Sequence, residues 1–113
     1  MKKVLLDENL PRQIKRYFSA DFEVISVPDL GWQSKKNDEL LTAMDSAKID
    51  YLLTSDKKLR YQQNLEKYKV RIVVLLTFDN RLKNLIAEIG EIEAKMNEAN
   101  ELDKIIEIDI RRK

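Results

Sequence analysis

Runs of apolar residues are spaced along the chain at intervals that predict buried β-strands. The four clearest runs cover residues 4–6, 22–27, 51–54 and 71–78. They are short and rich in leucine, isoleucine and valine, as expected for strands that are covered on both faces. A fifth segment, IIEIDI at residues 105–110, alternates apolar with acidic side chains, so we expect a strand with one exposed face at a sheet edge.

The segments between these strands carry the signals of helices. Asn and Asp residues, which cap helix N-termini, precede stretches in which apolar residues recur at helical spacing. The predicted helices follow Pro11, begin at Asn37 or Asp38, and begin at Asp79 or Asn80, the last being one long helix to about Met96. Residues 57–68 are expected to be short helix or irregular, and residues 29–37 a loop.

Strands that alternate with helices imply right-handed crossovers between parallel strands. We therefore predict an α/β fold in three layers, a Rossmann-like domain with a mostly parallel sheet of about five strands flanked by helices. At 113 residues with 43% hydrophobic content, the chain is expected to be a single domain over residues 1–113.

Composition restricts the possible chemistry. The chain has 21 Lys plus Arg against 20 Asp plus Glu, so no overall field favours nucleic acid or membrane. It has no cysteine and no histidine, which excludes disulfides, zinc–thiolate sites, Ser–His catalysis and His-bound metals. The apolar run near the N-terminus is too short for a signal peptide or a membrane span, so we expect a cytoplasmic protein without a membrane partner.

Acidic residues follow three of the predicted strands. Because the carboxyl ends of parallel strands meet at one edge of a sheet, where ligands bind, these acids are expected to converge. An acidic pair that opens the second helix is expected near the same edge. Clustered carboxylates repel each other unless a cation lies among them, and oxygen ligands favour Mg²⁺ or Mn²⁺. The predicted metal-site residues are Asp7, Glu8, Asp38, Glu39, Asp56 and Asp79.

Each acid taken alone could instead simply cap a helix. The pairs at residues 7–8 and 38–39 argue for more, because capping needs only one acid.

Basic and aromatic residues near the acids are candidates for binding RNA. Cations contact phosphates, and an aromatic ring can stack on an unpaired base. The candidates are Arg12, Lys57, Lys58, Arg60 and Tyr61. Solvated surface lysines and an inward-packed Tyr61 are the alternatives. Trp32 is a lid over the sheet edge, a partner contact or a core residue.

Three segments resemble a known family, in the same order along the chain. They are KVLLDENLP at residues 3–11, VPDLGWQSKKNDELLTAM at 27–44 and YLLTSDKKLRYQQNL at 51–65. They are similar to the small PIN-like proteins of the DUF5615 group, relatives of the ribonuclease toxins of bacterial toxin–antitoxin operons. The resemblance reaches to about Leu85. It implies a PIN-like sheet, a Mg²⁺ or Mn²⁺ site, endoribonuclease activity, inhibition by a cognate antitoxin protein and a possible homodimer.

The resemblance also assigns roles to the acids. Asp7 matches the first PIN acid, Asp38 with Glu39 the second, and Asp56 the third, while Asp79 is the candidate for the fourth. The hypothesis is that Asp7, Asp38 and Asp56 are catalytic. They would ligate metal ions that orient water for in-line attack on an RNA phosphodiester, with Glu8 or Glu39 completing the shell.

Two other classes of function remain open. A receiver domain also has acids after its first strand and an Asp after its third, but it needs a lysine after its fifth strand, where this chain has RRK. A catalytically silent PIN-like module would bind a partner protein through the last helix, the edge strand and Trp32, and would need no metal.

Overall fold

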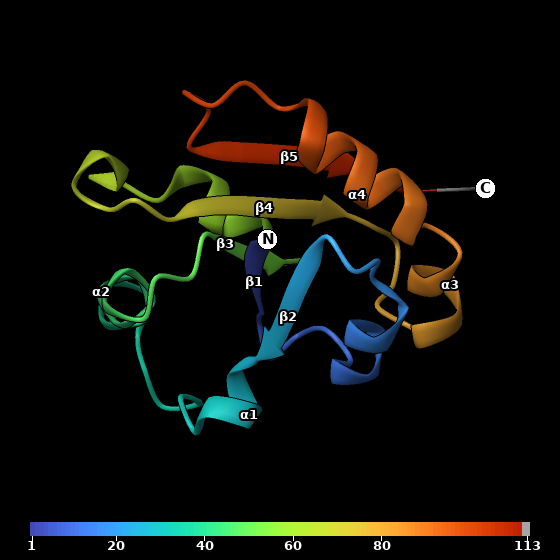
Figure 1. Ribbon diagram of the computed structural model, residues 1–113, viewed down its shortest axis with the longest axis horizontal. Coiled ribbons are helices and arrows are strands. Elements are labelled where there is room, and N and C mark those ends of the chain that lie inside the picture. The colour runs from blue at the N-terminus through green and yellow to red at the C-terminus, as the bar shows by residue number, and fades with distance from the viewer. Residues whose placement is uncertain (112–113) are drawn as a thin grey trace.

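A computed structural model shows the chain as a parallel five-stranded sheet with helices on both faces (Figure 1). The structure describes residues 1–111. The strands are β1 (Lys2–Leu6), β2 (Phe22–Ser26), β3 (Tyr51–Thr54), β4 (Arg71–Leu76) and β5 (Ile105–Asp109). Their order across the sheet is β2-β1-β3-β4-β5, and all neighbours run parallel. The predicted α/β fold with a parallel sheet of five strands is confirmed.

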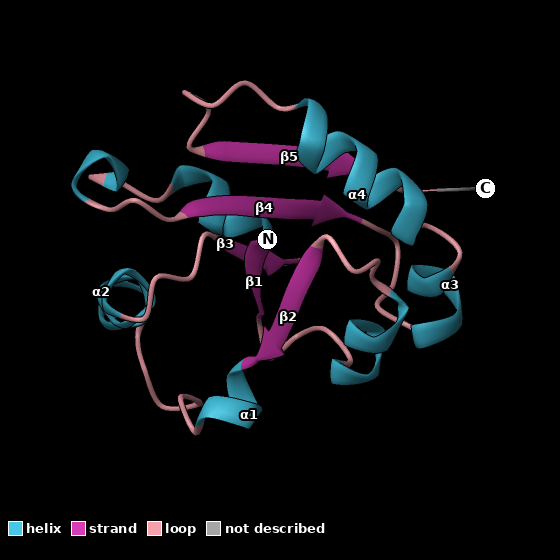
Figure 2. Cartoon of the chain, in the orientation of Figure 1, coloured by secondary structure: helices cyan, strands magenta, loops and turns pink. Residues whose placement is uncertain are grey.

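The helical segments are short, as the secondary-structure colouring of Figure 2 makes clear. Four are α-helical: α1 (Val27–Leu30), α2 (Asn37–Ser46), α3 (Leu82–Ile86) and α4 (Ile89–Glu98). Three are 3-10 helices: η1 (Arg12–Tyr17), η2 (Lys57–Tyr61) and η3 (Leu65–Lys67). None of the helices among residues 1–111 has the length and apolar character needed to cross a membrane.

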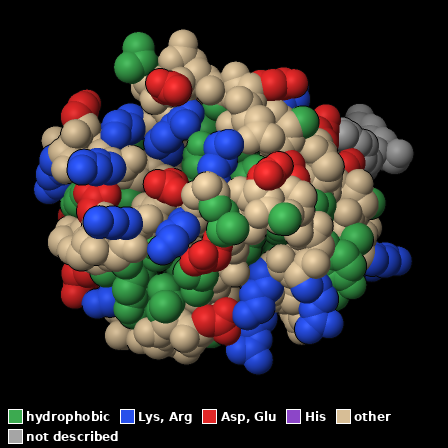
Figure 3. Space-filling view, viewed as in Figure 1, with side chains coloured by type: hydrophobic (Ala, Val, Ile, Leu, Met, Phe, Trp, Pro, Cys, Tyr) green, Lys and Arg blue, Asp and Glu red, His purple; other side chains and the backbone are tan. Residues whose placement is uncertain are grey.

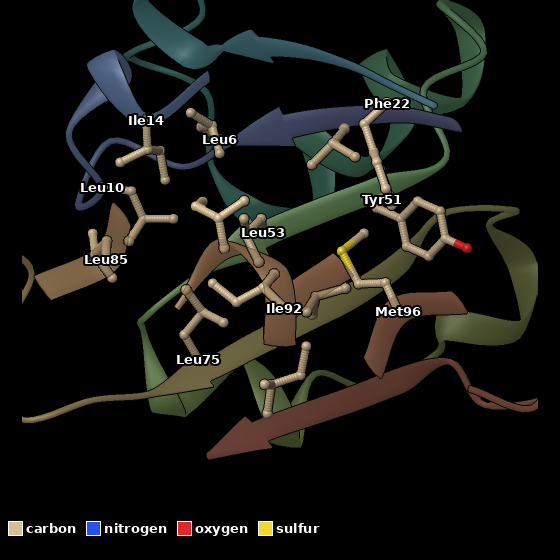
Figure 4. Packing of buried hydrophobic residues seen from close by; sticks show 14 of the residues in the cluster. Leu6, Leu10, Ile14, Phe22, Tyr51, Leu53, Leu75, Leu85, Ile92 and Met96 are labelled. Atoms are coloured by element: carbon tan, nitrogen blue, oxygen red, sulfur yellow. The ribbon is translucent and has the colours of Figure 1, made fainter. Parts of the chain in front are cut away.

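Two apolar cores lie on opposite faces of the sheet because successive strand residues point to opposite sides. On one face, side chains from η1, α3 and α4 pack against the strands, among them Ile14, Leu85 and Ile92 (Figure 4). On the other face, α1, α2, η2 and η3 contribute residues such as Leu41 and Leu59. The two cores account for the near-continuous apolar sequence of β3 and β4, which are buried on both sides.

The connections between strands depart from the prediction in one respect. The crossovers from β3 to β4 and from β4 to β5 proceed in the same direction across the sheet, but η2 and η3 cover one face and α3 and α4 the other. Two such crossovers have opposite hands, so the expectation of right-handed connections throughout is wrong. η1 has only six residues, and α3 and α4 cover the same face of the sheet together with it.

The prediction of one long helix after Asp79 is also wrong. The chain forms two helices there, α3 and α4, separated by a break between Ile86 and Ile89. The break is not at Gly90, which lies within α4. α3 packs against η1, whereas α4 packs against β5. A single straight helix could not reach both surfaces, although the apolar stripe from Leu85 to Met96 faces the same core throughout.

Smaller differences concern the ends of elements. Residue 27, predicted to end a strand, begins α1, because Ser26 caps this helix by accepting a hydrogen bond from the Asp29 N–H at 3.3 Å. α1 also occupies the start of the predicted loop. α2 begins at Asn37, so its capping residue is Lys36, and the prediction that Asn37 or Asp38 caps it is wrong. The Lys36 N–H donates to Glu39 Oε1 at 3.3 Å.

The last strand is at a sheet edge, as the alternation in IIEIDI predicts. Ile106 and Ile108 are buried against α4, while Glu107 and Asp109 are exposed on the opposite face.

Candidate functional site

The candidate site lies at the edge of the sheet where the strands end, between β1 and β3, where the order of the strands reverses. From β1 the chain moves outward to β2 and then returns past β1 to β3. In open parallel sheets, ligands bind beyond the carboxyl ends of the strands at such a reversal. The residues that follow β1 and β3 are Asp7 and the pair Ser55 and Asp56. The Asp7 N–H donates to the Leu53 carbonyl at 3.0 Å, which continues the pairing of β1 with β3 past the last strand residue.

The buried hydroxyl of Thr54 connects the two acids. Thr54 Oγ1 donates to Asp7 Oδ2 at 2.7 Å and accepts from the Asp56 N–H at 3.0 Å. Asp7 Oδ1 accepts from the Glu8 N–H at 2.8 Å, so both carboxylate oxygens are oriented. Asp7 is half-buried and Thr54 is fully buried. The structure therefore places the Asp7 carboxylate and the backbone N–H of Asp56 around one hydroxyl.

Three neutral polar residues extend this network. Asn9 Nδ2 donates to Thr54 Oγ1 at 3.3 Å, and Asn9 Oδ1 accepts from the Ser55 N–H at 3.4 Å. Asn80, from the loop after β4, donates through Nδ2 to the Asn9 carbonyl and to Ser55 Oγ, both at 2.9 Å. Loops after three neighbouring strands thus meet in one hydrogen-bonded group, which we call the Thr54 cluster: Asp7, Asn9, Thr54, Ser55, Asp56 and Asn80.

Reasoning from sequence missed the neutral members of this cluster, because it weighed charge and metal-ligand chemistry first. Their signal was position, since Asn9, Ser55 and Asn80 each lie within four residues of a strand end and beside an acid.

The other predicted acids have separate surroundings. Asp38 lies in the first turn of α2, where its Oδ1 accepts from Gln62 Nε2 at 3.3 Å, and its neighbour Glu39 binds the N–H of Lys36. Glu8 is exposed beside Asp7. Asp79 accepts from the Arg81 N–H at 2.9 Å and from Asn84 Nδ2 at 2.8 Å. The backbone N–H of Arg81 and the amide of Asn84 lower the pKa of Asp79.

Capping chemistry therefore accounts for part of the acidic pattern. Asp56 itself caps η2 through Oδ1, which accepts from the Lys58 N–H at 3.0 Å. Within residues 1–111, no group of three or more acids lies close enough together to hold a metal ion. Asp7 and Asp56 nevertheless offer oxygen donors alone, which is the chemistry that Mg²⁺ and Mn²⁺ prefer. Mg²⁺ is often held by one or two carboxylates together with waters and a substrate phosphate, so this pair fits that kind of site.

The predicted RNA-binding residues differ in their exposure to solvent and in whether they already form an ion pair. Lys57 and Lys58 are exposed at the start of η2, directly after Asp56. Arg60 is paired instead with Glu107 of β5, with Nη1 and Oε1 3.2 Å apart, and its guanidinium lies 5.2 Å from the centre of the Tyr61 ring. The hydrogen bond to Glu107 raises the pKa of Arg60. Tyr61 is 72% exposed, so its ring does not pack inward.

Arg12 and Trp32, the remaining candidate residues, lie outside the Thr54 cluster. Arg12 lies 3.8 Å from Asp29 and is largely exposed. Trp32 is half-buried against the core formed by α1 and α2, so of its three possible roles a core contact is the one that the structure shows. On the face of the molecule shown in Figure 3, basic and acidic side chains are interspersed and form no single-sign patch.

A small cavity of about 240 Å³ lies just beyond the ends of β4 and β5, and no member of the Thr54 cluster lines it. Its lining includes Phe78, Asp79, Asn84 and Ile110. Phe78 is 64% exposed there.

Comparisons with known proteins add no assignment. The chain matches no family model, no curated protein and no solved structure.

Proposed function

We propose that this protein is a metal-dependent endoribonuclease whose site is centred on Asp7 and Asp56. The observation that carries the proposal is the Thr54 hydroxyl, which joins the acid after β1 to the acid after β3 at the reversal of strand order. The sequence resemblance to PIN-like ribonucleases points to the same two positions.

In this proposal the two acids hold Mg²⁺ or Mn²⁺ together with a phosphate of the RNA. A bound Mg²⁺ lowers the pKa of a coordinated water and stabilises the charge on phosphate oxygens. Thr54 and the Glu8 N–H keep the Asp7 carboxylate oriented. Lys57 and Lys58 lie next to Asp56 in the sequence and would attract and position the RNA backbone.

Asp38 and Glu39 do not join the Asp7 and Asp56 pair among the described residues. The proposal therefore needs only two carboxylates, and metal binding should be tighter in the presence of RNA, because the phosphate supplies missing ligands.

The biological role implied by the resemblance is that of a toxin in a bacterial type II toxin–antitoxin system, acting in the cytoplasm. A cognate antitoxin protein would bind the chain and block RNA cleavage. Pairing of two copies belongs to the same proposal.

The test is RNA cleavage by purified wild-type protein and the variants Asp7→Asn and Asp56→Asn, with Mg²⁺, with Mn²⁺ and with EDTA. Asn keeps an oxygen that can accept from Thr54 but removes the negative charge. We expect cleavage only with metal, and loss of at least about 100-fold in either variant at an unchanged unfolding midpoint. Cleavage that persists in Asp7→Asn or in EDTA would contradict the proposal.

A catalytically silent protein-binding module is the second candidate. It is favoured by the absence of any three-acid group in residues 1–111, by the capping of η2 by Asp56, and by the local hydrogen bonds that engage Asp79. It predicts that an Asp7→Asn/Asp56→Asn protein keeps full affinity for its protein partner and that wild type cleaves no RNA.

A receiver domain is a weaker candidate. Its fold has the same strand order as this sheet. Its crossovers are all right-handed, however, whereas the β3–β4 and β4–β5 crossovers of this chain have opposite hands. The second residue after β5 is Arg111, which binds the side chain of Asp109 through Nε at 2.9 Å and Nη2 at 2.7 Å. A guanidinium engaged in this way is a poor substitute for the lysine that the receiver mechanism requires.

A further inference from the structure

The loop after β4 contributes one side chain, Asn80, to the Thr54 cluster. Its Nδ2 donates to the backbone carbonyl of Asn9 and to Ser55 Oγ, each at 2.9 Å. Asn9 follows β1 and Ser55 follows β3, so a single amide group holds together the loops that carry Asp7 and Asp56.

The orientation of this amide is set by its partners. A backbone carbonyl can only accept, so the group that faces Asn9 must be the NH₂ group and not the oxygen. Asn80 Oδ1 is buried and has no hydrogen-bond donor among the described residues. A buried acceptor without a partner is unfavourable. The two hydrogen bonds that Nδ2 donates therefore account for the placement of the Asn80 side chain. Its Oδ1 makes no hydrogen bond that could do so.

The neighbouring Asp79 has no share in this arrangement. Its carboxylate accepts from Arg81 and Asn84 at the start of α3. The contribution of the β4 loop to the site is thus a neutral donor where the sequence suggested a fourth acid.

We infer that Asn80 is a positioning residue for the Asp7 and Asp56 site. The inference rests on the proposed function. Asn80 acts through Asn9 and Ser55. The Ser55 N–H donates to Asn9 Oδ1, and Asn9 Nδ2 donates to the Thr54 hydroxyl. Thr54 in turn binds the Asp7 carboxylate and the Asp56 N–H. Groups that orient metal ligands without touching the metal typically change metal affinity by about 10–100-fold when removed.

The test compares Asn80→Ala with Asn84→Ala in the full chain. Asn84 is the matched control, because it is also an Asn that donates through Nδ2 in the next turn of the chain, but to Asp79. Mn²⁺ affinity is measured by calorimetry, alongside the melting temperature, in the presence of a short RNA in which a CH₂ group replaces the bridging oxygen that would leave, so that the P–O bond to be broken is absent. We expect Asn80→Ala to weaken Mn²⁺ binding by about tenfold or more, and Asn84→Ala to leave it within about twofold.

A second variant, Ser55→Ala, removes only one of the two acceptors. It should weaken Mn²⁺ binding by roughly threefold, the scale of one hydrogen bond, and add nothing to Asn80→Ala in the double variant. If Asn80→Ala does not fold, Ser55→Ala carries the test. Unchanged affinity in Asn80→Ala, or an equal loss in Asn84→Ala, would overturn the positioning role.

Failure of the proposed function has a different signature. If wild type binds no Mn²⁺ with or without RNA, the nuclease proposal falls, and hydrogen exchange then decides the role of Asn80. Asn80→Ala should speed exchange at the Ser55 and Asp56 amides, which donate to Asn9 and Thr54, by about tenfold relative to Asn84→Ala. Equal exchange in the two variants would refute the positioning role on its own.

Discussion

Thr54 Oγ1 lies 2.7 Å from Asp7 Oδ2, and this hydrogen bond joins the last residue of β3 to the first residue after β1. The two residues are 47 positions apart in the sequence. Because the same hydroxyl accepts from the Asp56 N–H, one buried oxygen holds both the Asp7 carboxylate and the backbone of Asp56. Stability and the proposed chemistry therefore depend on the same side chain.

Removal of this hydroxyl should destabilise the fold. Thr54→Val keeps the shape of the side chain but leaves the Asp56 N–H and one Asp7 oxygen without their partner. We expect a loss of about 1–3 kcal/mol in the free energy of unfolding, measured by urea denaturation. Thr54→Ser keeps the hydroxyl and should lose less, mainly the packing of one methyl group. A Val variant as stable as the Ser variant would show that the hydroxyl contributes little.

The cations of η2 should differ in their contribution to RNA binding. Each phosphate contact to a single strand contributes about 0.7 to the slope of log affinity against log salt. Lys57→Ala and Lys58→Ala should each reduce the slope by about that amount. Arg60→Ala should reduce it less, because Arg60 is already paired with Glu107.

The control for Arg60 is Glu107→Gln, which frees the guanidinium. Binding titrations with single-stranded RNA should then show a steeper salt dependence than wild type. If Arg60→Ala flattens the slope as much as Lys57→Ala does, the ion pair with Glu107 opens on binding and the ranking is wrong.

Acid should destabilise the protein in part through Asp29. Hydrogen bonds from Lys15, at 2.6 Å, and from Ser26 lower the pKa of Asp29 from 3.8 to about 2. A carboxyl whose pKa is lower in the folded state adds stability above its unfolded pKa and loses it as the pH falls. This contribution should be complete above pH 3.8 and decline as the pH falls through about 2.

Melting temperatures of wild type and Asp29→Asn between pH 5 and pH 2, spanning the window given by these pKa values, measure this contribution. The difference between the two proteins should shrink as the pH falls. Asp21→Asn, which changes an exposed acid before β2, is the matched control. A difference that stays constant with pH would mean that Asp29 stabilises the fold without its charge.

The two glycines should respond in opposite ways to substitution by alanine. Gly90 lies within α4, where an added Cβ meets no atom within 4 Å, so Gly90→Ala should stabilise the protein by about 0.5–1 kcal/mol. Gly31 ends α1 with φ at +69°, a left-handed conformation, so Gly31→Ala should cost about 1–2 kcal/mol. Thermal or urea unfolding of both variants tests the contrast, and a stabilising Gly31→Ala would contradict it.

Much of the architecture could be read from local pattern. The apolar runs at β3 and β4 and the alternation in β5 predicted buried and edge strands, because a strand's side chains alternate between faces whatever lies around it. The break between α3 and α4 could not be read in this way. The stripe that includes Leu85 and Ile92 keeps helical spacing through the break, and only the separate surfaces of η1 and β5 explain the change of direction.

The same distinction between local pattern and tertiary contacts applies to the candidate site. The sequence by itself determined that Asp7 and Asp56 lie at the same edge of a parallel sheet, since acids placed after buried strands reach its carboxyl edge. Only the tertiary structure decided that Thr54, Asn9 and Asn80 connect their loops, and that Arg60 pairs with Glu107. It also decided that the Asp79 carboxylate binds the Arg81 N–H and the Asn84 amide. These are hydrogen bonds and ion pairs between residues on different elements. Their formation depends on distances of a few tenths of an ångström, which local periodicity does not encode.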